Sequence, residues 1–217
     1  DPGHAWSPNA TVEPKTCACC WNALLPGTGR SLYLLYRAGS PRDMALAASP
    51  DEGATWTHHG AVGSFGWEAK SCPHTGGGLA LTGRGNAQTL HVSAWTGREG
   101  AAGLYYLAST DGGATWSKPR HLGGEDARYS DLAAAKDGTL SAVWDEITDG
   151  RYAVFRSLSK DGGRSWSAPE RLSDTGAHAT RPRVAAAGGR FIVFWTETRD
   201  GRPGALMVDG KPLAGAK

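Results

Sequence analysis

The stretch Ser109–Trp116, with the sequence Ser-Thr-Asp-Gly-Gly-Ala-Thr-Trp, decides the fold because the chain repeats it. Ser49–Trp56 reads Ser-Pro-Asp-Glu-Gly-Ala-Thr-Trp, and Ser159–Trp166 reads Ser-Lys-Asp-Gly-Gly-Arg-Ser-Trp. A fourth, decayed turn at Leu206–Gly210 keeps an aspartate and a glycine but lacks the tryptophan. Self-similarity at a spacing of about 50 residues is typical of proteins built from stacked structural units. The sequence therefore predicts about four copies of one unit.

Each copy also contains an alternating apolar segment that ends in an aromatic residue. These segments are Ser31–Tyr36, Thr89–Trp95, Thr139–Trp144 and Arg190–Trp195. Alternation with a period of two predicts β-strands, and no window shows a sustained apolar stripe at helical spacing. The 31 glycines of the chain favour turns over helices. We therefore expect an all-β protein whose units are four-stranded antiparallel meanders, which are the blades of a β-propeller.

The spacing of these markers also predicts the domain organisation. We expect a single domain over residues 1–217, with repeats at roughly 17–70, 71–123, 124–175 and 176–217. The innermost strands are expected at Gly77–Leu81, Tyr129–Ala135 and Arg183–Ala187, because alanine and glycine suit the crowded axis of a propeller.

The eight-residue repeat resembles the Asp box, or BNR repeat, of the sialidase-superfamily β-propellers, Ser-x-Asp-x-Gly-x-Thr-Trp. In that family the boxes lie on the outside of the blades, so the resemblance implies structural roles for Asp51, Asp111 and Asp161. Sialidase-like propellers have six blades, which need on the order of 300 residues. A chain of 217 residues holds about four. Removed N-terminal blades, a short propeller and a homo-oligomer that completes the propeller all remain open.

Composition and charge restrict the kinds of partner. The 23 basic and 21 acidic residues give a formal net charge of +2, which is too even for binding nucleic acid by bulk charge. No apolar run reaches the length of about 18 residues needed for membrane insertion. A glycan or another small-molecule ligand is the expected partner. Because the chain begins at Asp1 without a hydrophobic leader, we expect a removed leader and a secreted or periplasmic location.

The loops that enter the innermost strands gather at the mouth of a propeller channel, and here they carry unusual chemistry. All four cysteines of the chain lie in the first two of these loops, as Cys17, Cys19, Cys20 and Cys72, with His74 close to the last. Disulfides without metal are one interpretation, because an even cysteine count is normal in exported proteins. A bridge from one of the first three to Cys72 would leave two close thiols. With His74, these form a soft ligand set for copper or zinc, and a reactive thiol is the third alternative.

The remaining mouth loops contain Arg128–Asp131 and Thr180–Arg183. Tyr129 and the residues after it look like the sialidase segment that carries the nucleophilic tyrosine. The resemblance implies that Tyr129 is a nucleophile, with Asp131 as a second catalytic contact, and that Arg98, Arg128 and Arg181 bind an acidic substrate. Guanidinium groups suit a carboxylate because they can donate two parallel hydrogen bonds.

Two functional hypotheses follow. The first is binding or exo-sialidase-type hydrolysis of acidic glycans at the channel mouth. The sequence lacks the Arg-Ile-Pro segment that supplies the first sialidase arginine, so the enzymatic form stays open. The second is a copper- or zinc-binding propeller, and no cofactor is otherwise implied. A scaffold module that holds a partner protein is a third, because one fold hosts several activities.

Overall fold

The computed structural model describes residues 8–199, 204–209 and 211–212. These residues form four sheets, each with four antiparallel strands in chain order. Blade 1 contains β1 Ala23–Pro26, β2 Leu32–Arg37, β3 Met44–Ser49 and β4 Thr57–Ala61. Blade 2 contains β5 Gly78–Thr82, β6 Thr89–Thr96, β7 Gly103–Ser109 and β8 Arg120–Gly123, with a short 3-10 turn at Gly85–Ala87. Within these ranges, no helix is both long and apolar enough to cross a membrane.

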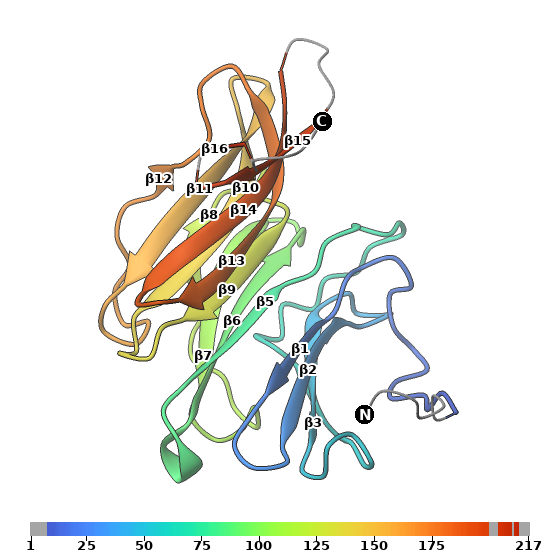
Figure 1. Cartoon of the computed structure of the whole chain (residues 1–217). Coiled ribbons are helices and arrows are strands. Elements are labelled where there is room, and N and C mark those ends of the chain that lie inside the picture. The colour runs from blue at the N-terminus through green and yellow to red at the C-terminus, as the bar shows by residue number, and fades with distance from the viewer. Residues whose placement is uncertain (1–7, 200–203, 210, 213–217) are drawn as a thin grey trace.

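Blades 3 and 4 repeat the same order. Blade 3 contains β9 Ser130–Ala134, β10 Leu140–Thr148, β11 Arg151–Ser159 and β12 Glu170–Arg171. Blade 4 contains β13 His178–Ala187, β14 Arg190–Thr198, β15 Ala205–Val208 and β16 Lys211–Pro212. The first strands pack in succession, β1 on β5, β5 on β9 and β9 on β13, so they form the inner edge of the array (Figure 1). The predicted all-β propeller class is confirmed.

The last inner strand differs from the prediction. The segment Thr180–Arg183 was expected to be a loop before the strand, but it lies within β13, where a register shift between Thr180 and Arg183 breaks the pairing with β14. Pro182 has no backbone N–H to donate, and Arg181 has a φ of 57°. Both features are typical of a β-bulge, which bends the strand and redirects its side chains.

The repeated turns have the structural role that the resemblance implies. Asp111 accepts the backbone N–H of Thr115 at 2.9 Å and the Ser109 hydroxyl at 2.7 Å, which closes the turn. Asp51 and Asp161 accept the equivalent bonds. Trp166 packs its ring edge against Tyr106 of the preceding blade, with ring centroids 5.0 Å apart. The Asp boxes therefore close the turns, and that of blade 3 also contributes to packing between blades.

Inner strands approach each other closely at Gly78. A Cβ atom at this position would lie 2.4 Å from the backbone nitrogen of Leu132 on β9, a distance that real Cβ atoms do not reach. Only glycine allows β5 and β9 to pack at this separation. The predicted preference of the axis for small residues therefore has a direct steric cause at this point.

A buried histidine links the strands of blade 2. Both ring nitrogens of His91 are bonded, Nδ1 to the Tyr106 hydroxyl at 2.7 Å and Nε2 to the Thr82 hydroxyl at 2.8 Å. The side chain is completely buried. Burial lowers the pKa of His91 from 6.5 to about 4, because a charged imidazolium would lose its hydration. The ring is therefore neutral in the folded protein at neutral pH.

This shift predicts acid lability. Above pH 6.5 both folded and unfolded chains carry a neutral His91, whereas between pH 6.5 and 4 only the unfolded chain takes up the proton. The free energy of unfolding should fall through this range by about 3 kcal/mol more in the wild type than in His91→Gln. Urea unfolding at several pH values measures the difference. His121→Gln, at an exposed imidazole, is the control, and equal slopes for wild type and His91→Gln would contradict the assignment.

Candidate functional site

The loops that enter the inner strands of different blades meet at one end of the molecule. The loop before β1 contacts the loop before β5 through sulfur atoms, since Cys17 Sγ lies 3.2 Å from Cys72 Sγ. The same loop reaches blade 3, where Trp21 stacks on Tyr129 with ring centroids 5.0 Å apart and an interplanar angle of 19°. Segments more than one hundred residues apart in the sequence therefore share one surface.

Four sulfur atoms form a compact cluster at this surface, which we call the sulfur cluster. The Sγ atoms of Cys17, Cys19, Cys20 and Cys72 all lie within 4.8 Å of one another. Cys19 and Cys72 form a disulfide, whereas Cys17 and Cys20 are free thiols 3.1 Å apart. Cys17 and Cys20 are buried, Cys72 is half-buried and Cys19 is exposed. Two loops thus bring all cysteines of the chain to one place.

A buried cation lies beside the sulfur cluster. Arg37 is only 1% exposed and donates hydrogen bonds to the carbonyl oxygens of Thr75, Arg42 and Trp95 and to the Thr75 hydroxyl, at 2.6 to 3.1 Å. Burial acts to lower its pKa, while the charges of Cys20, Cys17 and Asp43 act in the opposite direction. A buried guanidinium is costly without compensating acceptors and anions. Arg37 therefore favours negative charge on the sulfur atoms.

The two free thiols differ in acidity. Burial acts to raise the pKa of Cys17, but hydrogen bonds from Cys20 and the backbone and the charge of Arg42 lower it overall. Burial, together with the hydrogen bond to Cys17, raises the pKa of Cys20 to about 11. As the pH rises, Cys17 therefore loses its proton before Cys20 does. The Cys20 thiol then donates a hydrogen bond to the Cys17 thiolate.

His74 lies near the sulfur cluster but is not part of it. Its Nδ1 atom is 2.9 Å from the carbonyl oxygen of Cys72, and its side chain is exposed. The group of metal-ligating side chains within 4.8 Å of one another contains the four cysteines and not His74. The sequence prediction of a mixed cysteine and histidine ligand set therefore differs from the described geometry, in which the histidine bonds to the backbone.

A second group, which we call the aromatic–arginine cluster, contains Trp21, Tyr129, Arg181 and Arg183. The guanidinium carbon of Arg181 lies 5.3 Å from the Tyr129 ring centroid, and that of Arg183 lies 5.2 Å from the Trp21 ring. Cation–π contacts of this kind hold the guanidinium groups over the rings without using up their N–H donors. Both arginines are exposed. The cluster thus presents two cationic groups and a half-buried tyrosine at the mouth.

Asp131 is held by backbone amides. One carboxylate oxygen accepts the N–H of Leu132 at 3.0 Å, and the other accepts the N–H of Val184 on β13 at 3.1 Å. Arg183 lies 3.8 Å away. Burial raises the pKa of Asp131, against the effect of these bonds. Asp131 therefore joins blade 3 to blade 4, and it lies close to Arg183, which belongs to β13 of blade 4.

The bulge in β13 is held by a carboxylate that the sequence analysis did not select. Asp145 is completely buried and accepts the backbone N–H groups of Tyr129 and Arg181, each at 2.9 Å, together with the Thr180 hydroxyl. Burial raises its pKa, against the effect of these bonds. Asp145 therefore positions both Tyr129 and Arg181.

Arg37 and Asp145 occupy the same place in their repeats, directly after the aromatic residue of the second strand. Thr96 and Thr196 stand there in the other two blades. Each charged residue bonds the entry segment of the next blade, Arg37 at Thr75 and Asp145 at Thr180 and Arg181. A charged residue at a repeat position where the other two blades have threonine is a sequence signal that could have identified both.

The two other predicted substrate arginines have different partners. Arg98 donates to the carbonyl oxygen of Phe65 at 2.6 Å, and Arg128 lies 4.3 Å from the Trp95 ring centroid and donates to the carbonyl oxygen of Glu125. Within the described residues, neither guanidinium group has a hydrogen bond or a cation–π contact with the Tyr129 side chain. The structure therefore brings Tyr129, Asp131 and Arg181 into one neighbourhood but places Arg98 and Arg128 against other groups.

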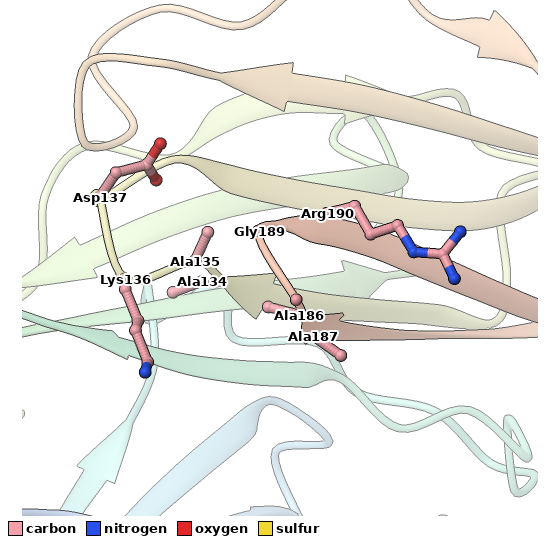
Figure 2. A pocket seen from close by; sticks show the side chains of 9 residues that line it. Ala134, Ala135, Lys136, Asp137, Ala186, Ala187, Gly189 and Arg190 are labelled. Atoms are coloured by element: carbon pink, nitrogen blue, oxygen red, sulfur yellow. The ribbon is translucent and has the colours of Figure 1, made fainter.

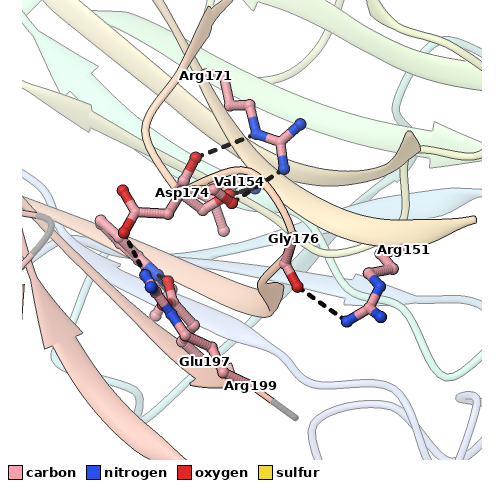
Figure 3. A network of polar contacts seen from close by, with 9 residues as sticks. Arg151, Val154, Arg171, Asp174, Gly176, Glu197 and Arg199 are labelled. Carbon is pink, nitrogen blue, oxygen red and sulfur yellow. Dashed lines mark hydrogen bonds and ion pairs between the residues drawn. The ribbon is translucent and has the colours of Figure 1, made fainter. Parts of the chain in front are cut away.

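A polar network supports the same end of blade 4 (Figure 3). Glu197 is nearly buried and accepts the Trp195 indole N–H at 3.0 Å and the Arg199 guanidinium at 2.8 Å. Arg199 also pairs with Asp174 in the segment that enters β13. The network fixes this entry segment and leaves these charges paired.

The hollow drawn in Figure 2 lies at the other end of the strands. It has a volume of about 310 Å³ and is lined by the turns β9–β10 and β13–β14, chiefly by alanine and glycine. Lys136 and Arg190 extend away from the alanine floor in Figure 2. A shallow hollow with small apolar walls offers a ligand few directed contacts. The sulfur cluster and the aromatic–arginine cluster both lie at the mouth, away from this hollow.

Comparison with known proteins supports the fold. No protein-family model and no curated protein sequence matches the chain. Among solved structures, it is similar to a Hadza microbial sialidase, with 18% identity and a TM-score of 0.59, covering 86% of this chain and 43% of that one. A Trypanosoma rangeli sialidase in complex with 2,3-difluorosialic acid gives 17% identity and a TM-score of 0.55, covering 86% of this chain and 35% of that one.

A Penicillium chrysogenum α-L-arabinanase complexed with arabinobiose has a similar fold, with 14% identity and a TM-score of 0.57, covering 89% of this chain and 67% of that one. The chain thus spans less than half the length of the sialidases that it matches. Together these likenesses show that the chain has a β-propeller fold similar to that of these sialidases and this arabinanase. At this identity they define the fold, and function must be argued from the site.

The role of Asp145 is testable. Replacing it with alanine leaves the amides of Tyr129 and Arg181 without their acceptor, so Asp145→Ala should lower the free energy of unfolding by about 2–4 kcal/mol. Amide hydrogen exchange at Tyr129 and Arg181 should accelerate under native conditions. Asp126→Ala, at an exposed carboxylate, is the control. Unchanged exchange at both amides would refute the positioning role.

Proposed function

We propose that this propeller binds one soft metal ion, Cu(I) or Zn²⁺, through the thiolates of Cys17, Cys19, Cys20 and Cys72. The observation that carries the proposal is the mutual proximity of all four Sγ atoms, within 4.8 Å, at the channel mouth. Thiolates are soft ligands that select Cu(I) and Zn²⁺ over hard cations such as Mg²⁺ and Ca²⁺.

The distances from Cys17 to the other three sulfur atoms fit such an ion after small adjustments. Zinc–sulfur bonds of about 2.3 Å in a tetrahedral site place the sulfur atoms about 3.8 Å apart. From Cys17 Sγ, the distances to Cys19, Cys20 and Cys72 are 3.7, 3.1 and 3.2 Å. For these three pairs, expansion by about 0.1 to 0.7 Å accommodates the ion, whereas Cys19 and Cys72 separate only once their disulfide is reduced. The exposed Cys19 offers a side from which the metal can enter.

The surrounding charge also supports a thiolate site. Four thiolates with Cu(I) or Zn²⁺ carry a net negative charge, which is costly to bury without a nearby cation. Arg37 is buried beside Cys20, and Arg42 acts on Cys17. Arg37 is fixed by carbonyl oxygens, so it remains in place when the metal leaves.

Full coordination requires reduction of the Cys19–Cys72 disulfide. An external dithiol supplies the two electrons and is itself oxidised to a disulfide, and the protein gains two thiols that lose their protons when the metal binds. With the disulfide intact, Cys17 and Cys20 remain as a two-thiolate site. The disulfide also supports the exported location that the sequence predicts, since such bonds persist in oxidising compartments.

Metal binding is tested by elemental analysis. Chain reduced with a dithiol and loaded anaerobically with Zn²⁺ or Cu(I) should hold about one ion per chain after gel filtration. Cys72→Ser should lower retention because it removes one of four thiolates, with at least about a tenfold loss of affinity in a chelator competition. His74→Ala is the matched control and should retain the ion. Metal-free wild type after loading, or equal retention by Cys72→Ser, would refute the proposal.

A second candidate function rests on the aromatic–arginine cluster. We propose that Arg181, Arg183 and Tyr129 bind the carboxylate and ring of an acidic glycan, with Tyr129 as the nucleophile if the chain is an exo-sialidase-type hydrolase. Exposed guanidinium groups over aromatic rings favour this, as does the sialidase-like fold. Sialidases are the glycosidases that use a tyrosine where others use a carboxylate.

This candidate predicts saturable binding of N-acetylneuraminate, measured by calorimetry. Arg181→Ala should weaken binding about tenfold, because one charge-assisted contact is lost. Arg164→Ala, in the Asp box of blade 3, is the control and should bind normally. If the chain is an enzyme, it should release the fluorophore from a fluorogenic sialoside, and Tyr129→Phe should abolish turnover. Absence of saturable binding would remove this candidate and leave the metal proposal untouched.

A further inference from the structure

Cys17 occupies the centre of the sulfur cluster. Its Sγ atom is 3.2 Å from Cys72 Sγ and 3.7 Å from Cys19 Sγ, which are the two atoms of the disulfide. It is also 3.1 Å from the Cys20 thiol. A free thiol is therefore in contact with both halves of a disulfide inside the folded protein.

Such contacts permit thiol–disulfide exchange, in which a thiolate attacks one sulfur of a disulfide and displaces the other. We propose that the cluster is a thiol–disulfide exchange centre in which Cys17 attacks Cys72 and releases Cys19. The Cys17–Cys72 bond forms as the Cys19–Cys72 bond breaks, and the electron pair of the broken bond goes to Cys19 Sγ. Cys19 then takes up a proton in place of the one that Cys17 lost, so the step balances without an external oxidant or reductant.

The difference in burial between Cys17 and Cys19 determines which free thiol is accessible to solvent before and after the exchange. Cys17 and Cys20 are 7% and 8% exposed, whereas Cys19 is exposed at the surface. The exchange therefore converts a buried free thiol into an exposed one. The class of substrate is an external disulfide or thiol, of a small molecule or a flexible peptide, that reaches Cys19 but not Cys17. The attack forms a mixed disulfide at Cys19 when the partner is a disulfide, with the partner's second sulfur leaving as a thiolate.

The geometry distinguishes Cys17 from its neighbour. Cys20 lies 3.1 Å from Cys17, and the described contacts of up to 4.0 Å connect it to no disulfide sulfur. Cys17 is accordingly the attacking residue, and His74, which is exposed and lies outside the sulfur cluster, provides the control position. This inference goes beyond the proposed metal function, because the exchange uses the same atoms without any ion.

The test is alkylation of the oxidised, folded chain with N-ethylmaleimide, with chelator present and no reductant, followed by peptide mapping. In the wild type we expect label on Cys19 and recovery of a Cys17–Cys72 cross-linked peptide. Cys17→Ser should slow labelling of Cys19 by at least about tenfold, because nothing then displaces it. His74→Ala, at an exposed side chain outside the sulfur cluster, should label Cys19 at the wild-type rate. Circular dichroism confirms that each variant is folded, and Cys17→Ala serves if the serine variant is not.

Two results would overturn the exchange centre. One is wild-type chain labelled only at Cys17 and Cys20 with an intact Cys19–Cys72 bond. The other is equal labelling of Cys19 in wild type and in the Cys17 variants. Since no metal is present, these results are independent of the metal-loading experiment, so either proposal can fail without the other.

Discussion

The contact between blades 1 and 2 at the mouth of this propeller depends on the buried guanidinium group of Arg37. Arg37 ends the second strand of blade 1, and its hydrogen bonds reach Thr75 and Trp95 of blade 2. A cation in this position must be compensated, since a buried charge without partners is strongly destabilising. Carbonyl oxygens supply part of the compensation, and the charges of Cys20, Cys17 and Asp43 act in the same direction. The contact between blades 1 and 2 and the charge state of the cysteines are therefore coupled.

The same structural position recurs with the opposite charge. Asp145 ends the buried part of the second strand in blade 3 and accepts hydrogen bonds from the entry segment of blade 4, as Arg37 donates to that of blade 2. One inter-blade bond thus positions the sulfur cluster and the other positions Tyr129 and Arg181. The repeat that builds the fold has diverged at this position, and the two chemistries at the mouth depend on that divergence.

The sequence predicted the fold more completely than the site. Strict repetition of the Asp box and the alternating strands defined the blades, because both patterns are local. The meeting of the two cysteine loops could also be predicted from the sequence, because propeller topology brings the entry loops together. Three features could not be predicted from the sequence. They are the pairing of Cys19 with Cys72, the stacking of Trp21 on Tyr129, and the contacts of the Arg98 and Arg128 guanidinium groups with partners other than Tyr129. These depend on packing between residues distant in the chain, and the bulge at Pro182, which shifted the start of β13, depends on Asp145.

The proposed soft-metal site uses all four cysteines as ligands. X-ray absorption at the zinc or copper edge of the reduced, loaded wild-type chain tests it most directly, because it reports the atoms bound to the ion. If the four cysteines hold the ion, its shell contains sulfur only, at about 2.3 Å, with four sulfur atoms for Zn²⁺. A shell dominated by nitrogen or oxygen would show that the ion is held elsewhere and would rule out the four-cysteine site.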